Sequence, residues 1–357
     1  TVILAVLIGT FALACSTVIT VPVEPTPNIE ATVEARVAQE RAVDATVEAR
    51  LRVEKASTST VQAQPTNASV PIPTPRPIPT ATPAPAHTPT SVPIPTFEIL
   101  PKHPTLDCLN TQFQMFVEVF GLYVVAPSSA PEEYVTHSAN VLAQYIDNDA
   151  DGLPDDSAVL EHLQRENVLV PVWEMSTREQ FNQARRRTEC EDGVTLVASM
   201  YYDEDQWAIG GIESTGKWDT NLEEIWHIVS IGWYATYPEF FGDEPSKQSK
   251  LVDAMDFARG GRFFAVPDKY PDNAWYSYYD DTCDYGCQLH EYFYWITMAN
   301  IDALDSALTS KCAESSDEWN VCTQSELEKV DVLAFDLLNN HGFNLPTNIP
   351  NGRYRVN

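Results

Sequence analysis

The sequence predicts an α+β fold: a mostly helical single domain, with a small sheet next to one motif helix, on a helical and Pro/Thr-rich stalk. Three observations lead to this prediction. Apolar residues recur at helical spacing in most segments between 105 and 357. Two β-rich segments, 194–202 and 207–213, directly precede one of these helices. Pro, Thr, Ala and Ser dominate residues 57–101, which therefore cannot form a core.

The composition is that of a globular protein with a strongly acidic surface. The chain of 357 residues is 44% hydrophobic, which is sufficient for a packed core, and it carries a formal charge of −29. Residues 105–357 hold 43 acidic and 15 basic side chains and thus nearly all of that charge. Such a surface repels nucleic acid and attracts cations. We expect no nucleic-acid partner, although the same charge could serve solubility alone.

The first fifteen residues have the pattern of an export signal. Residues 2–14 carry no charge and are too few to span a membrane, but they suit the apolar core of a signal peptide. Residues 12–15 read Ala-Leu-Ala-Cys and resemble a bacterial lipobox. This resemblance implies a signal peptide over 1–15, a lipid on Cys15, and a membrane-anchored lipoprotein on the bacterial cell surface. The alternative is an ordinary signal peptide with an incidental Cys.

Residues 16–104 are predicted to be a tether. Residues 31–37 recur almost unchanged at 45–51, and this 14-residue period equals two heptads, so 16–56 is predicted to be a helical stalk. Its apolar seam is thin, which favours a solitary solvated helix. Residues 57–104 are predicted to be a disordered linker, because repeated Pro fixes φ and removes backbone donors.

The elements of the globular extracellular domain, 105–357, follow from periodicity, caps and turns. Helices are expected at residues 113–123, 132–146, 157–165, 176–187, 222–234, 249–258, 288–308 and 325–340. Strands are expected at residues 168–172, 194–202 and 207–213. A loop-like tail is expected over residues 342–357. No composition shift divides the domain.

A loop at 147–156 carries carboxylates at alternate positions. Calcium takes six to eight hard oxygen ligands, and such a loop can converge on one ion when a glycine, here Gly152, allows a sharp turn. The expected ligands are Asp147, Asp149, Asp151, the carbonyl of Leu153, and Asp155.

This loop resembles an EF-hand loop in its first nine positions, and equally the Asp-rich run of thrombospondin type-3 repeats. Helical patterns on both sides favour the EF-hand-like version, and either resemblance implies calcium binding. The loop departs from the EF-hand at Pro154 and at Ala158, where a bidentate Glu is usual, so Asp156 or Glu161 would have to substitute. The alternative is a solvated acidic turn that caps the next helix.

The motif helix over 222–234 has apolar residues at helical spacing, and Glu223 and His227 lie four apart on one face. With Glu224 between them, the segment resembles the His-Glu-x-x-His helix of zincin metallopeptidases with the first His replaced by Glu. In zincins the outer residues bind zinc and the inner Glu is the general base. The resemblance therefore implies Glu223 and His227 as ligands and Glu224 as the catalytic base.

Glu291, on a later helical run, is the predicted third ligand, as in the zincins whose third ligand is Glu. A Glu-rich ligand set also suits calcium or manganese. The alternative is that Glu223 and Glu224 are exposed acids at a helix start and that His227 packs at the edge of the core.

Six cysteines besides Cys15 predict three disulfides, because their number is even in an exported chain. They are Cys108, Cys190, Cys283, Cys287, Cys312 and Cys322. Pairing the cysteines that are close in sequence gives the disulfides 283–287 and 312–322. Cys108 and Cys190 then form the third pair. A thiolate zinc site is the competing interpretation, but the spacing matches no zinc-ribbon pattern.

Two classes of function agree with these features. One is a calcium-binding surface lipoprotein with a zincin-like metallohydrolase site acting on extracellular peptide. The other is a non-catalytic, calcium-dependent surface module that binds peptide or glycan, with aromatic residues of 270–281 lining a cleft. Together the Asp-rich loop, the motif helix and the Tyr/Trp/Cys-rich segment resemble a set of exported lipoproteins to which no activity is assigned.

Overall fold

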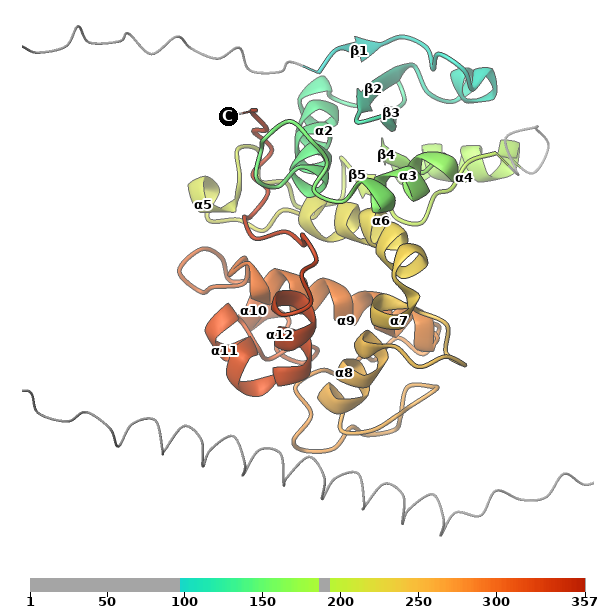
Figure 1. Cartoon of the computed structure of the whole chain (residues 1–357). Coiled ribbons are helices and arrows are strands. Elements are labelled where there is room, and N and C mark those ends of the chain that lie inside the picture. The colour runs from blue at the N-terminus through green and yellow to red at the C-terminus, as the bar shows by residue number, and fades with distance from the viewer. Residues whose placement is uncertain (1–96, 186–192, 357) are drawn as a thin grey trace, which may run out of the picture. The chain divides into compact units, whose positions relative to one another are not determined.

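Figure 1 shows the computed structural model of the chain, which describes residues 97–185 and 193–356. The chain divides into a unit of residues 1–86 and a unit of residues 87–357, and every described residue belongs to the second unit. The predicted lipid attachment at Cys15, the helical stalk and the linker up to residue 96 lie outside the described residues. Cys190, the predicted partner of Cys108, lies outside them too.

The described domain is α+β, with eleven α-helices and one five-stranded sheet, as the sequence predicts. The strands are β1 (Ile99–Leu100), β2 (Met115–Val119), β3 (Leu122–Ala126), β4 (Leu169–Trp173) and β5 (Met200–Tyr201). The helices are the 3₁₀ turn η1 (Asp107–Thr111), α2 (Glu132–Ile146), α3 (Ser157–Arg165), α4 (Met175–Arg185), α5 (Ile212–Thr215), α6 (Asn221–Thr236), α7 (Pro238–Phe241), α8 (Lys250–Ala258), α9 (Tyr285–Asn300), α10 (Lys311–Glu314), α11 (Gln324–Val330) and α12 (Val332–Asn339).

The sheet has the order β1-β2-β3-β4-β5, antiparallel from β1 to β3 and parallel from β3 to β5. β2 and β3 form a hairpin, and Val119 pairs with Leu122. The two residues between them, Phe120 and Gly121, have φ of +50° and +78°, the left-handed values of a two-residue hairpin turn. The helix predicted at 113–123 is therefore wrong: a run rich in Val and Phe, broken by Gly, favoured a hairpin.

Four further predictions need correction. The strand expected at 194–202 is reduced to β5 and a single bridge between Thr195 and Val168. Of the strand expected at 207–213, residues 207–211 form a turn, closed by a 2.7 Å hydrogen bond from Gly211 N to Ala208 O, and residues 212–213 begin α5. The helix expected at 288–308 ends at Asn300, two residues before Asp302, whose φ is +58°. The folded chain also begins before residue 105, because Ile99 in β1 pairs with β2.

The helix expected at 325–340 is divided into α11 and α12 by Asp331. This residue is fully buried and non-helical, with φ −109° and ψ 68°. Its carboxylate accepts hydrogen bonds from the backbone N–H of Ala334 and from the side chains of Trp275 and Tyr292. Asp331 therefore caps α12 and ties it to the core.

The motif helix α6 lies at the centre of the domain. In Figure 1 it runs between the sheet with α2 and α3 on one side and the helices α7–α12 on the other. Leu222, Ile225 and Trp226 are fully buried. Gly232 allows α3 to approach closely, because a Cβ there would lie 2.7 Å from a methyl group of Val159. The helix that carries two of the three predicted metal ligands is thus largely enclosed by the rest of the domain.

Two predicted disulfides are confirmed. Cys283 and Cys287 are bonded, with Cα atoms 5.3 Å apart, and Cys312 and Cys322 are bonded, with Cα atoms 5.8 Å apart. Both lie in the helical half of the domain, where they fix the start of α9 and of α10. In the part of the chain that the structure describes, none of the helices has both the length and the apolar character needed to cross a membrane.

Candidate metal centre

The first turn of α6 is anchored by buried polar side chains. Asp219 precedes the helix and accepts hydrogen bonds from the backbone and the side-chain amide of Asn221. Its other oxygen lies 2.6 Å from His137 Nε2 on α2, and this ion pair is buried. Ser138, also on α2, donates to the Asn221 side chain at 2.6 Å. These bonds hold the segment from which Glu223 projects.

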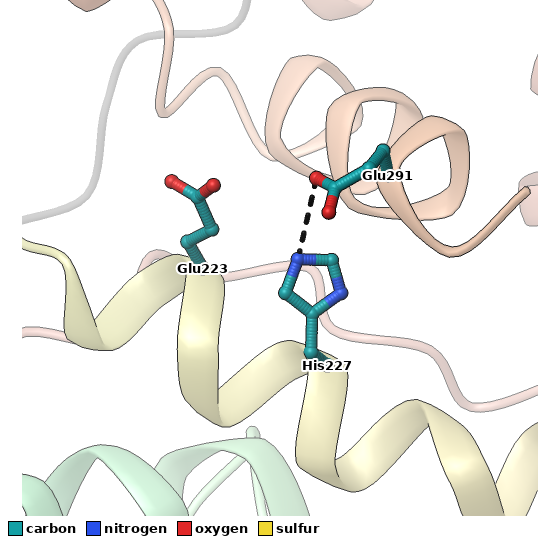
Figure 2. A group of neighbouring side chains, drawn as sticks. All are labelled: Glu223, His227 and Glu291. Atoms are coloured by element: carbon teal, nitrogen blue, oxygen red, sulfur yellow. Dashed lines mark ion pairs between the residues drawn. The ribbon is translucent and has the colours of Figure 1, made fainter. Parts of the chain in front are cut away.

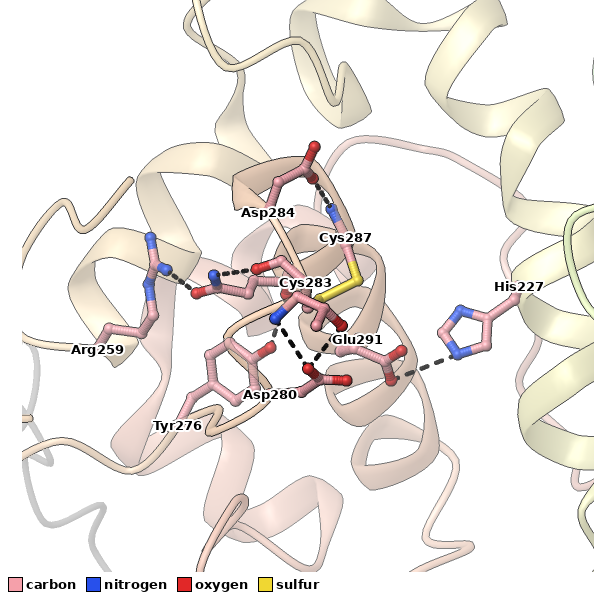
Figure 3. The surroundings of a disulfide bond; sticks show 10 residues. His227, Arg259, Tyr276, Asp280, Cys283, Asp284, Cys287 and Glu291 are labelled. Atoms are coloured by element: carbon pink, nitrogen blue, oxygen red, sulfur yellow. Dashed lines mark hydrogen bonds and ion pairs between the residues drawn. A yellow bond between two sulfur atoms is a disulfide. The ribbon is translucent and has the colours of Figure 1, made fainter. Parts of the chain in front are cut away.

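The start of α9 is fixed equally firmly (Figure 3). The Asp284 carboxylate accepts a hydrogen bond from the Cys287 backbone N–H, and the Cys283–Cys287 disulfide closes the same turn. Buried Arg259 donates to the side chain of Gln288 at 2.7 Å. Glu291 follows Cys287 by four residues, so the disulfide lies one helical turn from its backbone.

Glu223, His227 and Glu291 meet between α6 and α9 (Figure 2). One ligand atom from each lies within 4.8 Å of the other two. His227 Nε2 and Glu291 Oε2 are 3.5 Å apart and form an ion pair. The side chains are 24%, 14% and 20% exposed, respectively, so the group is recessed yet reachable from solvent. The structure thus brings together the three residues that the sequence singled out from two distant segments.

The electrostatics of the group favour a cation at its centre. Burial opposes a charge on His227, but the adjacent Glu291 carboxylate and the charges of Glu223 and Glu224 raise the pKa of His227 to about 9. The Glu223 carboxylate has a second cationic neighbour, Lys311, whose Nζ is 3.5 Å from Oε2. When no metal is bound, the proton on His227 and the ammonium of Lys311 therefore balance the negative charges of the Glu223 and Glu291 carboxylates.

Glu224 lies beside the group and has a different environment. Burial raises the pKa of Glu224 to about 7, although the charge of His227 acts in the opposite direction. Its Oε2 accepts a long hydrogen bond, 3.3 Å, from the backbone N–H of Ser199 just before β5. A carboxyl group with a pKa close to neutrality can both accept and return a proton there.

Two polar atoms close to the group are buried, the hydroxyl of Tyr294 and the indole N–H of Trp218, and this indole N–H has no hydrogen-bond partner among the described residues. The Tyr294 ring lies 5.7 Å from the His227 ring. Burial and the charge of Glu223 raise the pKa of Tyr294 well above its usual value. Buried polar groups are rarely left unpaired, and they mark places where a ligand or water completes the structure.

Sequence reasoning missed Lys311 and Glu318. The Lys311 ammonium lies 5.3 Å from the ring centre of Trp218 and 5.5 Å from that of Trp295. Glu318 accepts a 2.6 Å hydrogen bond from the Trp295 indole N–H, and burial, with the charges of Glu291 and Glu223, raises the pKa of Glu318 to about 7. No spacing in the sequence links either residue to the motif helix.

The acidic loop forms a second group. Ligand oxygens of Asp147, Asp149 and Asp151 lie within 4.8 Å of one another. Asp147 is fully buried and accepts hydrogen bonds from the backbone N–H groups of Asp151 and Gly152. Asp155 is outside this group of three, but burial and the three neighbouring carboxylates raise its pKa to about 6. Crowded carboxylates of this kind are stabilised by a cation.

Asp156 has a structural role in the next helix, while the carbonyl of Leu153 stays a predicted ligand. Asp156 caps α3 by accepting a hydrogen bond from Val159 N, and it also accepts one from the Tyr237 hydroxyl. Leu153 has an exposed side chain, and its backbone N–H donates to Asp151.

The C-terminal tail, predicted to be a loop, closes over the acidic loop. The Asn148 side chain accepts hydrogen bonds from the backbone N–H groups of Thr347 and Asn348, each 2.8 Å. The Tyr354 hydroxyl donates to the Asp147 carboxylate, and its backbone N–H donates to Asn140 on α2. Sequence reasoning missed this contact, because the segments are separated by about two hundred residues.

Comparison of the chain with protein-family models, with curated proteins and with solved structures finds no match. Its function has to be inferred from its own residues.

Proposed function

We propose that this domain is a zinc-dependent hydrolase of extracellular peptides, with Glu223, His227 and Glu291 as zinc ligands and Glu224 as general base. The observation that carries the proposal is the convergence of three ligand atoms from α6 and α9 within 4.8 Å. A catalytic zinc takes three protein ligands and keeps one position open. The His227–Glu291 ion pair explains two members of this group, and a metal ion gives a reason for Glu223 to join them.

The chemistry of the donors fits zinc. One imidazole nitrogen and two carboxylates are ligand types that zinc accepts in catalytic sites. Since the free site carries a proton on His227, zinc binding must displace it, and affinity should fall as the pH is lowered.

Glu224 supplies the proton transfers. A bound zinc ion would act as a Lewis acid toward the scissile carbonyl and make water more acidic. Glu224 accepts one proton from water while the water oxygen bonds to the carbonyl carbon and an electron pair moves to the carbonyl oxygen. That pair returns as the C–N bond breaks, and Glu224 gives the proton to the departing amine. Its pKa of about 7 suits both transfers.

The test is cleavage of fluorescein-labelled casein by the zinc-loaded protein. We expect Glu224→Gln to keep zinc and lose at least a hundredfold in rate, because the amide cannot accept the proton. His341→Ala, on an exposed residue at the end of α12, is the control and should cleave as the wild type does. A wild-type protein that holds zinc yet leaves casein intact at every pH between 6 and 9 would argue against the hydrolase.

A second proposal concerns the acidic loop, which we propose binds calcium and thereby stabilises the C-terminal tail. The supporting observation is the convergence of Asp147, Asp149 and Asp151 under a tail that hydrogen-bonds to Asp147. If the zinc proposal fails, a calcium-dependent surface module for peptide or glycan is the function that these features support. Attachment to a membrane through Cys15 stays a prediction from the sequence.

A further inference from the structure

We propose that Lys311 is a catalytic residue that binds the carbonyl oxygen of the scissile bond. This inference rests on the hydrolase proposed above and extends it to a residue that the zincin pattern does not contain. Three observations support it. The Lys311 ammonium lies beside Glu223, a proposed zinc ligand. Two tryptophan rings enclose it, and some of its N–H donors have no acceptor among the described residues.

The backbone of Lys311 is held in place. Lys311 begins α10, and its N–H donates to the Thr309 hydroxyl at 3.3 Å. The next residue is Cys312, which is buried and bonded to Cys322. A long, flexible side chain is thus projected from a fixed point, which lowers the entropy lost when it binds a ligand.

The ammonium group has three N–H donors and little water around it. Its side chain is only 20% exposed, and the faces of Trp218 and Trp295 form two of its walls. Indole faces attract a cation but leave its N–H donors without an acceptor oxygen. In the described part of the chain, Glu223 is the one residue whose oxygen lies within 3.5 Å of Nζ. The group can therefore take a further oxygen ligand at little cost in desolvation.

The surrounding charge decides which oxygen ligand is favoured. Glu223 and Glu291, together with Glu224 and Glu318 when these are ionised, place negative charge near this group, so a neutral oxygen ligand is favoured over an anion, which binds only weakly even when zinc offsets part of that charge. A peptide carbonyl is neutral on arrival and becomes negative only as the water oxygen attacks. A fixed ammonium next to that oxygen stabilises the transition state more than the substrate, which is what accelerates a reaction.

The experiment compares wild-type protein, Lys311→Met and Lys311→Arg in the zinc-loaded form. Met retains most of the apolar packing between the two indoles and removes the charge, whereas Arg keeps the charge. Calorimetric titration with inorganic phosphate, a tetrahedral oxyanion, measures the site without turnover. We expect Lys311→Met to bind phosphate at least tenfold more weakly and Lys311→Arg within threefold of the wild type. Lys217→Met, on an exposed lysine beside Trp218, should bind phosphate normally.

Casein cleavage provides the second readout. We expect kcat of Lys311→Met to fall about 10²–10³-fold with KM changed less than threefold, since the lost contact forms in the transition state. Zinc content should stay at the wild-type level, because Lys311 is not a ligand. If Lys311→Met holds zinc, binds phosphate and cleaves casein as the wild type does, the role of Lys311 is refuted while the hydrolase stands. If the wild type takes up no zinc or cleaves nothing, the hydrolase fails and Lys311 with it.

Discussion

Glu318 should destabilise the folded domain at alkaline pH. Burial raises the pKa of Glu318 from 4.5 to about 7, so the folded state holds its proton more tightly than the unfolded chain does. The contribution of protonated Glu318 to the free energy of unfolding is fully present below pH 4.5. It is lost as the pH rises through 7, because the folded domain then has to bury a charged carboxylate. A shift of this size corresponds to about 3 kcal/mol at pH 8, and solvent exposure reduces it.

Glu318→Gln removes the charge and keeps an oxygen that can accept the hydrogen bond from Trp295. We therefore expect the variant to be more stable than the wild type by about 1–3 kcal/mol at pH 8, and by less than about 1 kcal/mol at pH 5. Urea unfolding at both pH values, with EDTA present throughout, measures the difference. Glu328→Gln, on an exposed glutamate of α11, is the control and should change stability equally little at either pH. A Glu318→Gln protein that is less stable than the wild type at pH 8 would refute the reasoning.

Three further predictions follow from burial and bonding. Millimolar calcium should raise the melting temperature by several degrees relative to EDTA, and Asp149→Ala should remove that difference. Asp331→Ala should cost about 2–4 kcal/mol, because it leaves the buried Tyr292 hydroxyl and the partly buried Trp275 Nε1 without an acceptor. Thiol labelling of the denatured, unreduced protein should leave Cys283, Cys287, Cys312 and Cys322 unmodified, whatever it finds at the other cysteines.

For each of these three predictions, one experimental result would contradict it. Superimposable melting curves of the wild type with EDTA and with calcium would contradict the calcium site. Asp331→Asn is the partner variant to Asp331→Ala: it keeps an acceptor oxygen and should lose less, so equal losses would show that the hydrogen bonds are not the cause. Labelling of any of the four cysteines, located by peptide mapping, would contradict the disulfides.

Local patterns in the sequence were sufficient for the parts of the site that lie on one element. Glu223 and His227 share a face because a helix places residues four apart on one side, and the apolar periodicity of α6 is strong. Glu291 was found only through the resemblance to a three-ligand site. That it meets the other two depends on how α9 packs on α6, which no local pattern encodes.

The misses have physical reasons. The hairpin of β2 and β3 was interpreted as a helix because both of its strands are almost fully buried, so the polar alternation that marks a strand is absent. Lys311 and Glu318 reach the site from a loop and a short helix fixed by a disulfide. The tail over residues 347–356 contacts the acidic loop through single hydrogen bonds between distant segments. Such contacts are determined by tertiary packing.

The zinc content of the purified protein tests the central proposal most directly. After dialysis against zinc and then against zinc-free buffer at pH 8, elemental analysis should find about one zinc per chain in the wild type and in Glu224→Gln. His227→Ala should retain far less, because two carboxylates seldom hold the ion alone. A wild-type protein without zinc, or a His227→Ala protein with as much zinc as the wild type, would contradict a metal site between α6 and α9.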